Sequence, residues 1–125
     1  GTLTSRYYGQ SEVLLPSYAW YQVNSKNVAH ATGSLKPNDY GLFDMLGNGY
    51  EWCQGTYLPY AAATALGGMV AHKADVRPVK DSVSRVLRGG AFVIAPAFVR
   101  SSIRNNNLPA FSNFLYGFRP ARTYP

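Results

Sequence analysis

The sequence predicts an α+β fold with little regular secondary structure. Its 125 residues include 12 glycines and 8 prolines, and only 14% of the residues are charged. Glycine and proline punctuate a chain with turns, and the apolar stretches between them are short here. Because 46% of the residues are hydrophobic, the chain is not of the disordered class, and its length fits one compact domain over residues 1–125.

The first part of the chain is predicted to be mostly irregular, with two short helical turns. The first turn covers residues 11–15, with Ser11 as its N-cap. A loop rich in turn-forming residues follows over residues 33–41. The second helical turn is expected over residues 41–48, where Gly47 ends it.

Short strands are predicted in the rest of the chain, where β-prone residues alternate with others. A weakly patterned stretch over residues 55–81 is interpreted as a surface loop. The Gly89-Gly90 pair predicts a bulge or a close approach of the backbone. The predicted strands are residues 50–53, 84–87, 91–93, 99–104 and 117–121, and residues 105–115 form a long loop.

The basic residues are scattered rather than clustered. The formal net charge is +6, with eight arginines and four lysines against six acids. Nucleic-acid-binding domains gather such residues into a patch or stripe, so the dispersion argues against a nucleic-acid partner. We expect the arginines to hydrogen-bond loop carbonyls through their planar forks, in particular Arg88, Arg100, Arg104 and Arg119.

Cys53 is the single cysteine of the chain. One cysteine excludes a disulfide within the chain and a multi-cysteine zinc site, and a small buried hydrophobe is its expected role. No apolar run has the length of a membrane span. The opening GTLTSRYYGQ carries no signal-peptide pattern, and its abruptness predicts further sequence upstream.

Four segments, in order, carry a family resemblance. They are GLFDMLGNGYEWC at 41–53, RVLRGGAF at 85–92, RSSIR at 100–104 and GFRPAR at 117–122. Together they resemble the signature motifs of formylglycine-generating enzymes, the sulfatase-modifying-factor family. The upstream stretches GTLTSRYYG and LKPNDYG also fit. The resemblance implies a variant of the C-type-lectin fold, here as the C-terminal part of a domain truncated at its N-terminus, in a bacterial protein of the cytoplasm or cell surface.

The activity implied by the family name needs two cysteines. Formylglycine-generating enzymes use a cysteine pair that binds copper, and thiolates are suitable ligands for copper(I). Matching onwards from Gly89-Gly90 places the pair near Ile94 and Val99, which are both apolar in this chain. We therefore expect neither copper binding nor formylglycine formation.

A second branch of the family forms carbon–sulfur bonds at a non-haem iron. Its iron ligands are histidines, contributed mostly by an upstream helical domain. This chain has only His30 and His72, in expected loops, and their spacing does not indicate a facial triad. The alternative left open is that the chain is part of a family oxidoreductase, of either type, whose catalytic residues lie in the missing segment.

The favoured hypothesis is a binding module for a protein or a small molecule. Some family members are variable proteins diversified by retroelements, and in them the residues between the RGG and GFR motifs vary. The partner could also be the missing N-terminal segment of the same domain. The hypothesis predicts that residues 92–98 and 105–115 are largely exposed. If they are buried instead, they belong to the hydrophobic core rather than to a binding surface. The candidate ligand-binding residues are Phe92, Val93, Ile94, Ala95, Phe98, Ile103, Asn105, Asn106, Asn107, Phe111, Asn113, Phe114 and Leu115.

The resemblance also implies a structural calcium ion near the GNGYEW turn. Asn48 and Glu51 would supply side-chain oxygens for it. Calcium takes six to eight oxygen ligands, so these two side chains would supply only part of a calcium site. Whether the ion is retained stays open. Glu51 stands between aromatic residues and needs a partner if it is buried.

Overall fold

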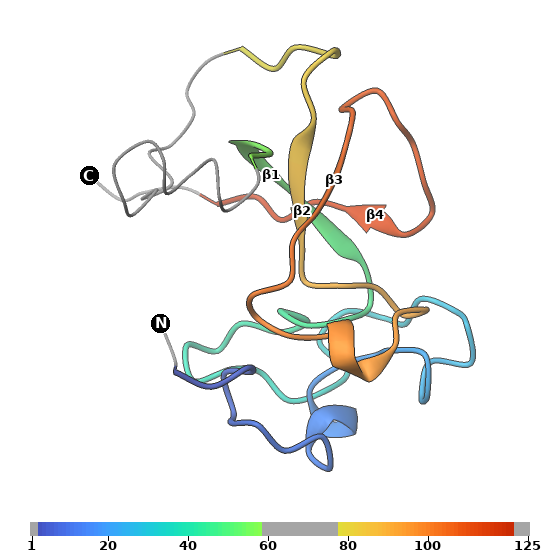
Figure 1. Cartoon of the computed structure of the whole chain (residues 1–125). Helices are drawn as coiled ribbons and strands as arrows, with labels where there is room; N and C mark the ends of the chain where they lie inside the picture. The colour runs from blue at the N-terminus through green and yellow to red at the C-terminus, as the bar shows by residue number, and fades with distance from the viewer. Residues whose placement is uncertain (1–2, 59–77, 122–125) are drawn as a thin grey trace.

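A computed structural model describes residues 3–58 and 78–121. It confirms the expected scarcity of regular structure, because the described part contains four strands and two short 3-10 turns (Figure 1). The elements are η1 (Leu15–Ser17), β1 (Tyr50–Thr56), β2 (Arg85–Arg88), η2 (Pro96–Phe98), β3 (Asn105–Asn107) and β4 (Tyr116–Gly117). None of the described helices is long and apolar enough to cross a membrane.

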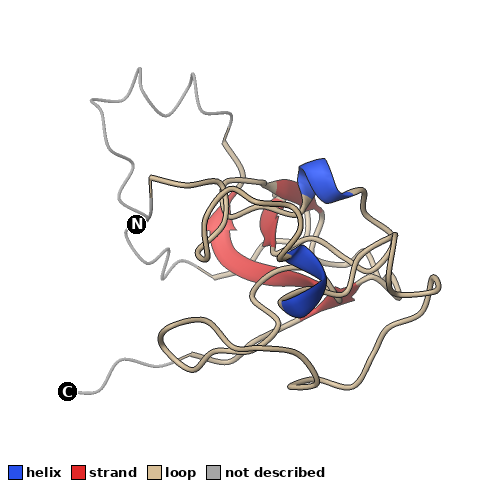
Figure 2. Ribbon diagram, turned by 90° about the horizontal axis from the view of Figure 1, so that it is seen from below, coloured by secondary structure: helices blue, strands red, loops and turns tan. Residues whose placement is uncertain are grey.

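The four strands form one mixed sheet in the order β3-β2-β1-β4. Strand β1 pairs antiparallel with β2, so that Trp52 lies opposite Leu87, and a bulge follows before Thr56 meets Arg85. Strand β4 is parallel to β1, and β3 is antiparallel to β2. Figure 2 shows the strands curled together and surrounded by loops, which fits the family's C-type-lectin-like fold.

Two hydrophobic clusters form the core. One gathers Leu15, Ala19, Tyr21, Leu46 and Val99 from the loops and from η1. The other covers the sheet with Tyr50, Leu87 and Ala91. Ile94 packs against both clusters, so the segment after Gly90 joins the loop half of the molecule to the sheet.

The two predicted helical turns are wrong in position or in kind. The first is a 3-10 turn that begins at Leu15 instead of residue 11, because Pro16 occupies its start, where no amide hydrogen bond is lost. Ser11 accepts only the Val13 amide at 3.3 Å, as in a local turn. Residues 41–48 form no helix, because Asp44 takes a left-handed φ of 54° that breaks a right-handed turn.

Strand boundaries also differ from the prediction. Strand β1 continues to Thr56, into the predicted loop 55–81, of which residues 59–77 lie outside the described part. Residues 91–93 and 99–104 are turns and loop rather than strands. The next strand is instead Asn105–Asn107, and the last one is Tyr116–Gly117 rather than 117–121.

The glycine step at Gly89-Gly90 is a close approach, as predicted. Both residues have positive φ angles, 89° and 86°, which favour glycine. The Gly89 carbonyl accepts the Gly47 amide at 2.8 Å. The glycine pair thereby joins the end of β2 to the turn that precedes β1.

Candidate functional site

The predicted ligand-binding residues fall into three classes of exposure. Phe98, Phe111 and Phe114 are exposed, with 55%, 49% and 82% of their surface accessible. Phe92 is only 4% exposed and belongs to the interior, so its predicted exposure is wrong. The remaining candidates are half-buried, namely Val93, Ile94, Ala95, Ile103, Asn105, Asn106, Asn107, Asn113 and Leu115. The segment is therefore partly core and partly surface.

A row of aromatic rings runs from the loop after β3, residues 108–115, onto the sheet. Phe111 lies 6.2 Å from Tyr116, and Tyr116 meets Trp52 edge-on at 5.6 Å, both measured between ring centroids. Tyr116 and Trp52 come from the adjacent strands β4 and β1. We call Phe111, Tyr116 and Trp52 the aromatic row. Such rings supply apolar area in preferred edge-to-face contacts.

A hollow of about 210 Å³ opens at the Trp52 end of the aromatic row. It is lined mainly by apolar atoms and includes Pro109 of the predicted binding segment. Its described lining residues are Trp52, Cys53, Gln54, Val79, Arg85 and Pro109. We call it the Trp52 hollow. Pro109 thus connects this hollow to the predicted binding segment.

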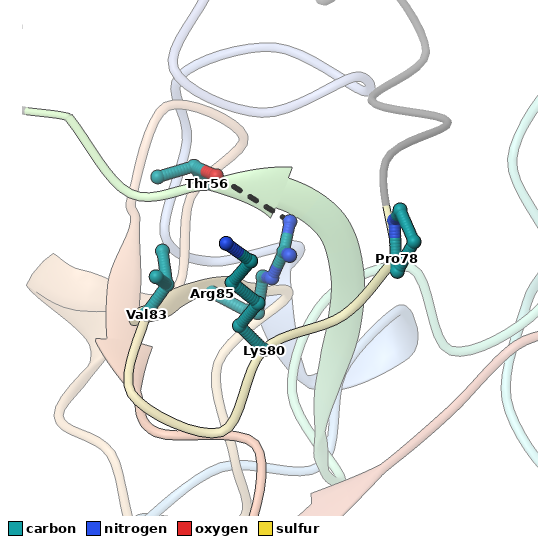
Figure 3. A pocket seen from close by; sticks show the side chains of 5 residues that line it. All are labelled: Thr56, Pro78, Lys80, Val83 and Arg85. Atoms are coloured by element: carbon teal, nitrogen blue, oxygen red, sulfur yellow. Dashed lines mark hydrogen bonds between the residues drawn. The ribbon is translucent and has the colours of Figure 1, made fainter.

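A second, more polar hollow of about 220 Å³ also has Arg85 in its lining (Figure 3). Lys80 and Arg85 line it together with Thr56, Pro78 and Val83. Arg85 is 5% exposed, and its Nη1 donates to the Gln54 carbonyl and to the Thr56 hydroxyl. These bonds hold the guanidinium against the bulge of β1, and Arg85 is the residue that the linings of the two hollows share.

The sequence prediction missed Trp52 and Arg85 as parts of this site. Both lie outside the segment between the RGG and GFR motifs. The alternation of YEWCQGT and SRVLR gives the side of the strand on which each residue lies. It does not give the register that brings Arg85 to Thr56, and this register places Arg85 beside the hollows.

The positions expected for a copper-binding pair are filled by hydrocarbon. Val99 is fully buried in the loop cluster, and Ile94 packs against the same cluster. Neither side chain has an atom that binds a metal. Within residues 3–58 and 78–121, no three His, Cys, Asp or Glu side chains come close enough to hold a metal ion. The described residues do not fit a copper site.

Cys53 and His30 have structural surroundings. Cys53 is half-buried on β1, and burial raises the pKa of its thiol against the opposing effect of Arg88 and Arg104. His30 stacks on Trp20 at 3.7 Å, and its Nε2 hydrogen-bonds the Ser25 carbonyl. His72 lies outside the described residues.

The two expected calcium ligands both contact protein groups. The Asn48 amide is bonded in both directions to the His30 backbone, through Oδ1 at 2.9 Å and Nδ2 at 3.0 Å. Both Glu51 carboxylate oxygens accept hydrogen bonds from Arg119. Asn48 and Glu51 therefore link the turn to His30 and Arg119 through hydrogen bonds, and calcium remains a prediction.

Three of the four arginines expected to bind loop carbonyls do so. Arg88 donates to the carbonyls of Ser101 and Ile103, both at 2.7 Å. Arg104 donates to Leu58, and Arg119 to Phe43. Arg100 instead donates to the hydroxyl of Ser102.

Comparison with known proteins supports the resemblance read from the motifs. A profile of the family described as "Sulfatase-modifying factor enzyme 1-like domain" matches residues 3–124. The formylglycine-generating enzyme of Streptomyces coelicolor is 28% identical over 97% of this chain and 42% of its own length. The serine/threonine-protein kinase pkn1 of Chlamydia pneumoniae is 38% identical over 71% of this chain and 14% of its own.

Solved structures share the fold. The Treponema denticola variable protein 1 superposes with a TM-score of 0.68 and 31% identity, over 86% of this chain and 37% of that one. PvdO from Pseudomonas aeruginosa gives a TM-score of 0.63 at 28% identity, over 83% of this chain and 38% of that one. The chain thus spans less than half the length of each of these similar proteins.

Proposed function

This chain belongs to the sulfatase-modifying factor enzyme 1-like domain family, and we propose that it uses the family fold for binding a ligand rather than for oxidation. Its likeness to a Treponema denticola variable protein supports this role. We extend the proposal to a diversified surface between residues 91 and 116. Within it, the exposed residues of the 108–115 segment would carry specificity, while the buried ones maintain the fold.

One observation carries the proposal: exposed aromatic side chains lie beside an open apolar hollow. Phe111 is 49% exposed and ends the aromatic row that leads to the Trp52 hollow. Phe114, in the same 108–115 segment, is 82% exposed, and its ring lies 6.2 Å from that of Phe92. Exposed apolar groups gathered in this way mark interaction sites, and aromatic residues are frequent energetic centres of interfaces.

The size of the hollow favours a protein ligand. Sites for drug-sized molecules measure about 300–1,000 Å³, whereas the Trp52 hollow measures about 210 Å³. That volume suits one apolar side chain or a small aromatic group. The exposed rings outside the hollow would then contact the flanking residues of the same partner.

A titration with a short peptide tests the proposal. A peptide with one tryptophan between two leucines, so that it has flanking residues for Phe111, is added while the indole N–H signal of Trp52 and the amides near Pro109 are followed by NMR. We expect saturable shifts there, and Phe111→Ser should weaken the affinity about tenfold, as truncating an aromatic anchor does. Phe118→Ser is the matched control, since Phe118 is 80% exposed and outside the segment. Shifts that are absent, or equally affected by both variants, would contradict the proposal.

Oxidation is tested separately. The purified chain is incubated with copper(I), oxygen and a peptide containing Cys-X-Pro-X-Arg, and the peptide is analysed by mass spectrometry. We expect no formylglycine, because the Ile94 and Val99 side chains have no metal-binding atoms. Conversion of the peptide by this chain alone would overturn the assignment as a binding module.

A further inference from the structure

Strand β3 lies at one end of the sheet, in the order β3-β2-β1-β4. It pairs only with β2 among the described strands, through Asn105 with Leu87, Asn106 with Val86 and Asn107 with Arg85. A strand in this position presents backbone amides along its outer side, which another chain can pair with by adding a strand. Proteins normally block such an edge.

The side chains of β3 bond the amides of the strand itself. The Asn105 Oδ1 accepts the N–H of Asn106 at 2.8 Å, and the Asn107 Oδ1 accepts the N–H of Leu108 at 2.9 Å. Residues two apart in a strand direct their amides to the same side, so the two bonds close one side of β3. The Ser84 carbonyl faces β1, because it accepts the Tyr57 amide, so the alternation along β2 directs Arg85 and Leu87 toward Asn107 and Asn105 of β3. The amides of Asn106 and Leu108 therefore lie on the outer side of β3.

The other end of the Asn107 side chain is held by a tyrosine. The Asn107 Nδ2 donates to the Tyr116 hydroxyl at 3.3 Å. Tyr116 lies opposite Tyr50 on β4 and β1, and Asn105 opposes the rise that burial causes in the pKa of Tyr50. The Asn107 side chain is therefore held at two points.

From these contacts we infer that Asn105 and Asn107 close the β3 edge against strand addition. A partner approaching this side of β3 meets the asparagine side chains and Leu108, which is 44% exposed and directly follows the strand, rather than free backbone amides. The inference does not depend on the proposed ligand, because it concerns only whether a further strand can pair with β3. Without the two asparagines, the preferred partner of the edge is the same strand of a second copy of this chain.

The test compares amide hydrogen exchange in two double variants and one single variant. In Asn105→Ala/Asn107→Ala, we expect the amides of Asn106 and Leu108 to exchange at least about tenfold faster, because their acceptors are removed. Asn105→Asp/Asn107→Asp keeps the accepting oxygens but loses the amide donors, including the one that Asn107 gives to Tyr116, and protection should persist because the two oxygens remain. Asn106→Ala is the matched control, because its side chain makes neither of these bonds. The single alanine variants give the same comparison, one amide at a time, if the double variant does not fold.

Self-association is the second measurement. Sedimentation velocity over a range of concentrations should show the alanine double variant associating at concentrations where the wild type and Asn106→Ala do not. Unchanged exchange at Asn106 and Leu108 in the alanine variants would overturn the inference. So would equal loss of protection in the aspartate pair, because the amide donors would then be responsible. Faster exchange without association would also overturn it, since the uncovered edge would not recruit a strand.

Discussion

The turn before β1 and the 108–115 segment illustrate opposite uses of polar and apolar groups. In the turn and the first two residues of β1, residues 47–51, side chains and backbone are matched closely: Asn48 bonds His30, Glu51 bonds Arg119, and Gly47 bonds Gly89. In the 108–115 segment, Phe111 and Phe114 leave much of their apolar surface in water. The turn maintains the fold, and the segment is available for binding, so substitutions should act on stability in the first and on affinity in the second.

The largest effect is expected at Gly47, within the turn. A Cβ built there would lie 2.2 Å from the Trp20 carbonyl oxygen, and the φ of 73° is strained for other residues. We expect Gly47→Ala to lower the free energy of unfolding by about 3 kcal/mol or more, or to prevent folding, because the neighbour is backbone. Urea denaturation measures this change.

Gly33→Ala is the matched control. Gly33 has a similar φ of 77°, but nothing lies within 4 Å of a Cβ built there. Its substitution should cost only the left-handed strain, about 1–2 kcal/mol. Equal effects at Gly33 and Gly47 would show that the contact with Trp20 is not decisive.

A smaller effect is expected at Arg119, which joins the C-terminal motif to the turn. Its guanidinium donates to both oxygens of Glu51 and to the Phe43 carbonyl. Lysine cannot reproduce this planar fork. The side chains of Arg119 and Glu51 are 34% and 26% exposed, so solvent screening limits the loss in Arg119→Lys to about 1 kcal/mol.

Arg100→Lys serves as the control for this change. Arg100 donates to Ser102, two residues away, rather than to the turn. Its stability should stay within about 0.5 kcal/mol of the wild type, as for ordinary surface changes. Thermal unfolding of both variants compares the two sites, and a larger loss for Arg100→Lys would break the comparison.

The sequence predicts those features whose geometry is determined by residues within a single motif. The four motifs predicted the family and the low content of regular structure, and the glycine step predicted the close approach at Gly89-Gly90. Strand β3 was missed because asparagine has low β propensity, and an Asn triple resembles a loop. Its strand depends on pairing with Arg85, Val86 and Leu87, far away in the sequence.

The same physical reason explains the errors at the site. Burial of Phe92 and exposure of Phe111 depend on how the segment folds back onto the sheet, which local patterning does not encode. Asp44 was placed in a helix, but its Oδ2 accepts the Gly33 amide at 2.8 Å in a left-handed conformation. Contacts between distant segments therefore decided the features that the sequence left open.

The smallest effect concerns Tyr7 and Tyr8, a part of the core whose polar groups are hydrogen-bonded less completely than those of residues 47–51. Tyr7 and Tyr8 pack with Tyr18, with ring centroids 4.4–5.6 Å apart. The hydroxyls of Tyr7 and Tyr8 are buried, and neither has a hydrogen-bond partner in the described part of the chain. Phenylalanine keeps the ring and removes the unpaired hydroxyl. Tyr7→Phe and Tyr8→Phe should therefore leave stability unchanged or raise it by up to about 1 kcal/mol, and a loss above that amount would reveal a partner for the hydroxyl.

The pH dependence of stability checks the same feature independently. Burial, reinforced for Tyr7 by Tyr8, Tyr18 and Asp44, raises the pKa of Tyr7 to about 12, and burial also raises the pKa of Tyr8 to about 12. The unfolded chain, with a tyrosine pKa near 10.0, loses these protons first. Stability should then fall as the pH rises from 10 through about 12, because the unfolded state binds fewer protons there. The fall should be smaller in the Tyr7→Phe/Tyr8→Phe double variant and unchanged in Tyr40→Phe, since Tyr40 is 89% exposed. An equal fall in all three proteins would mean that these two hydroxyls titrate in the folded protein as they do in the unfolded chain.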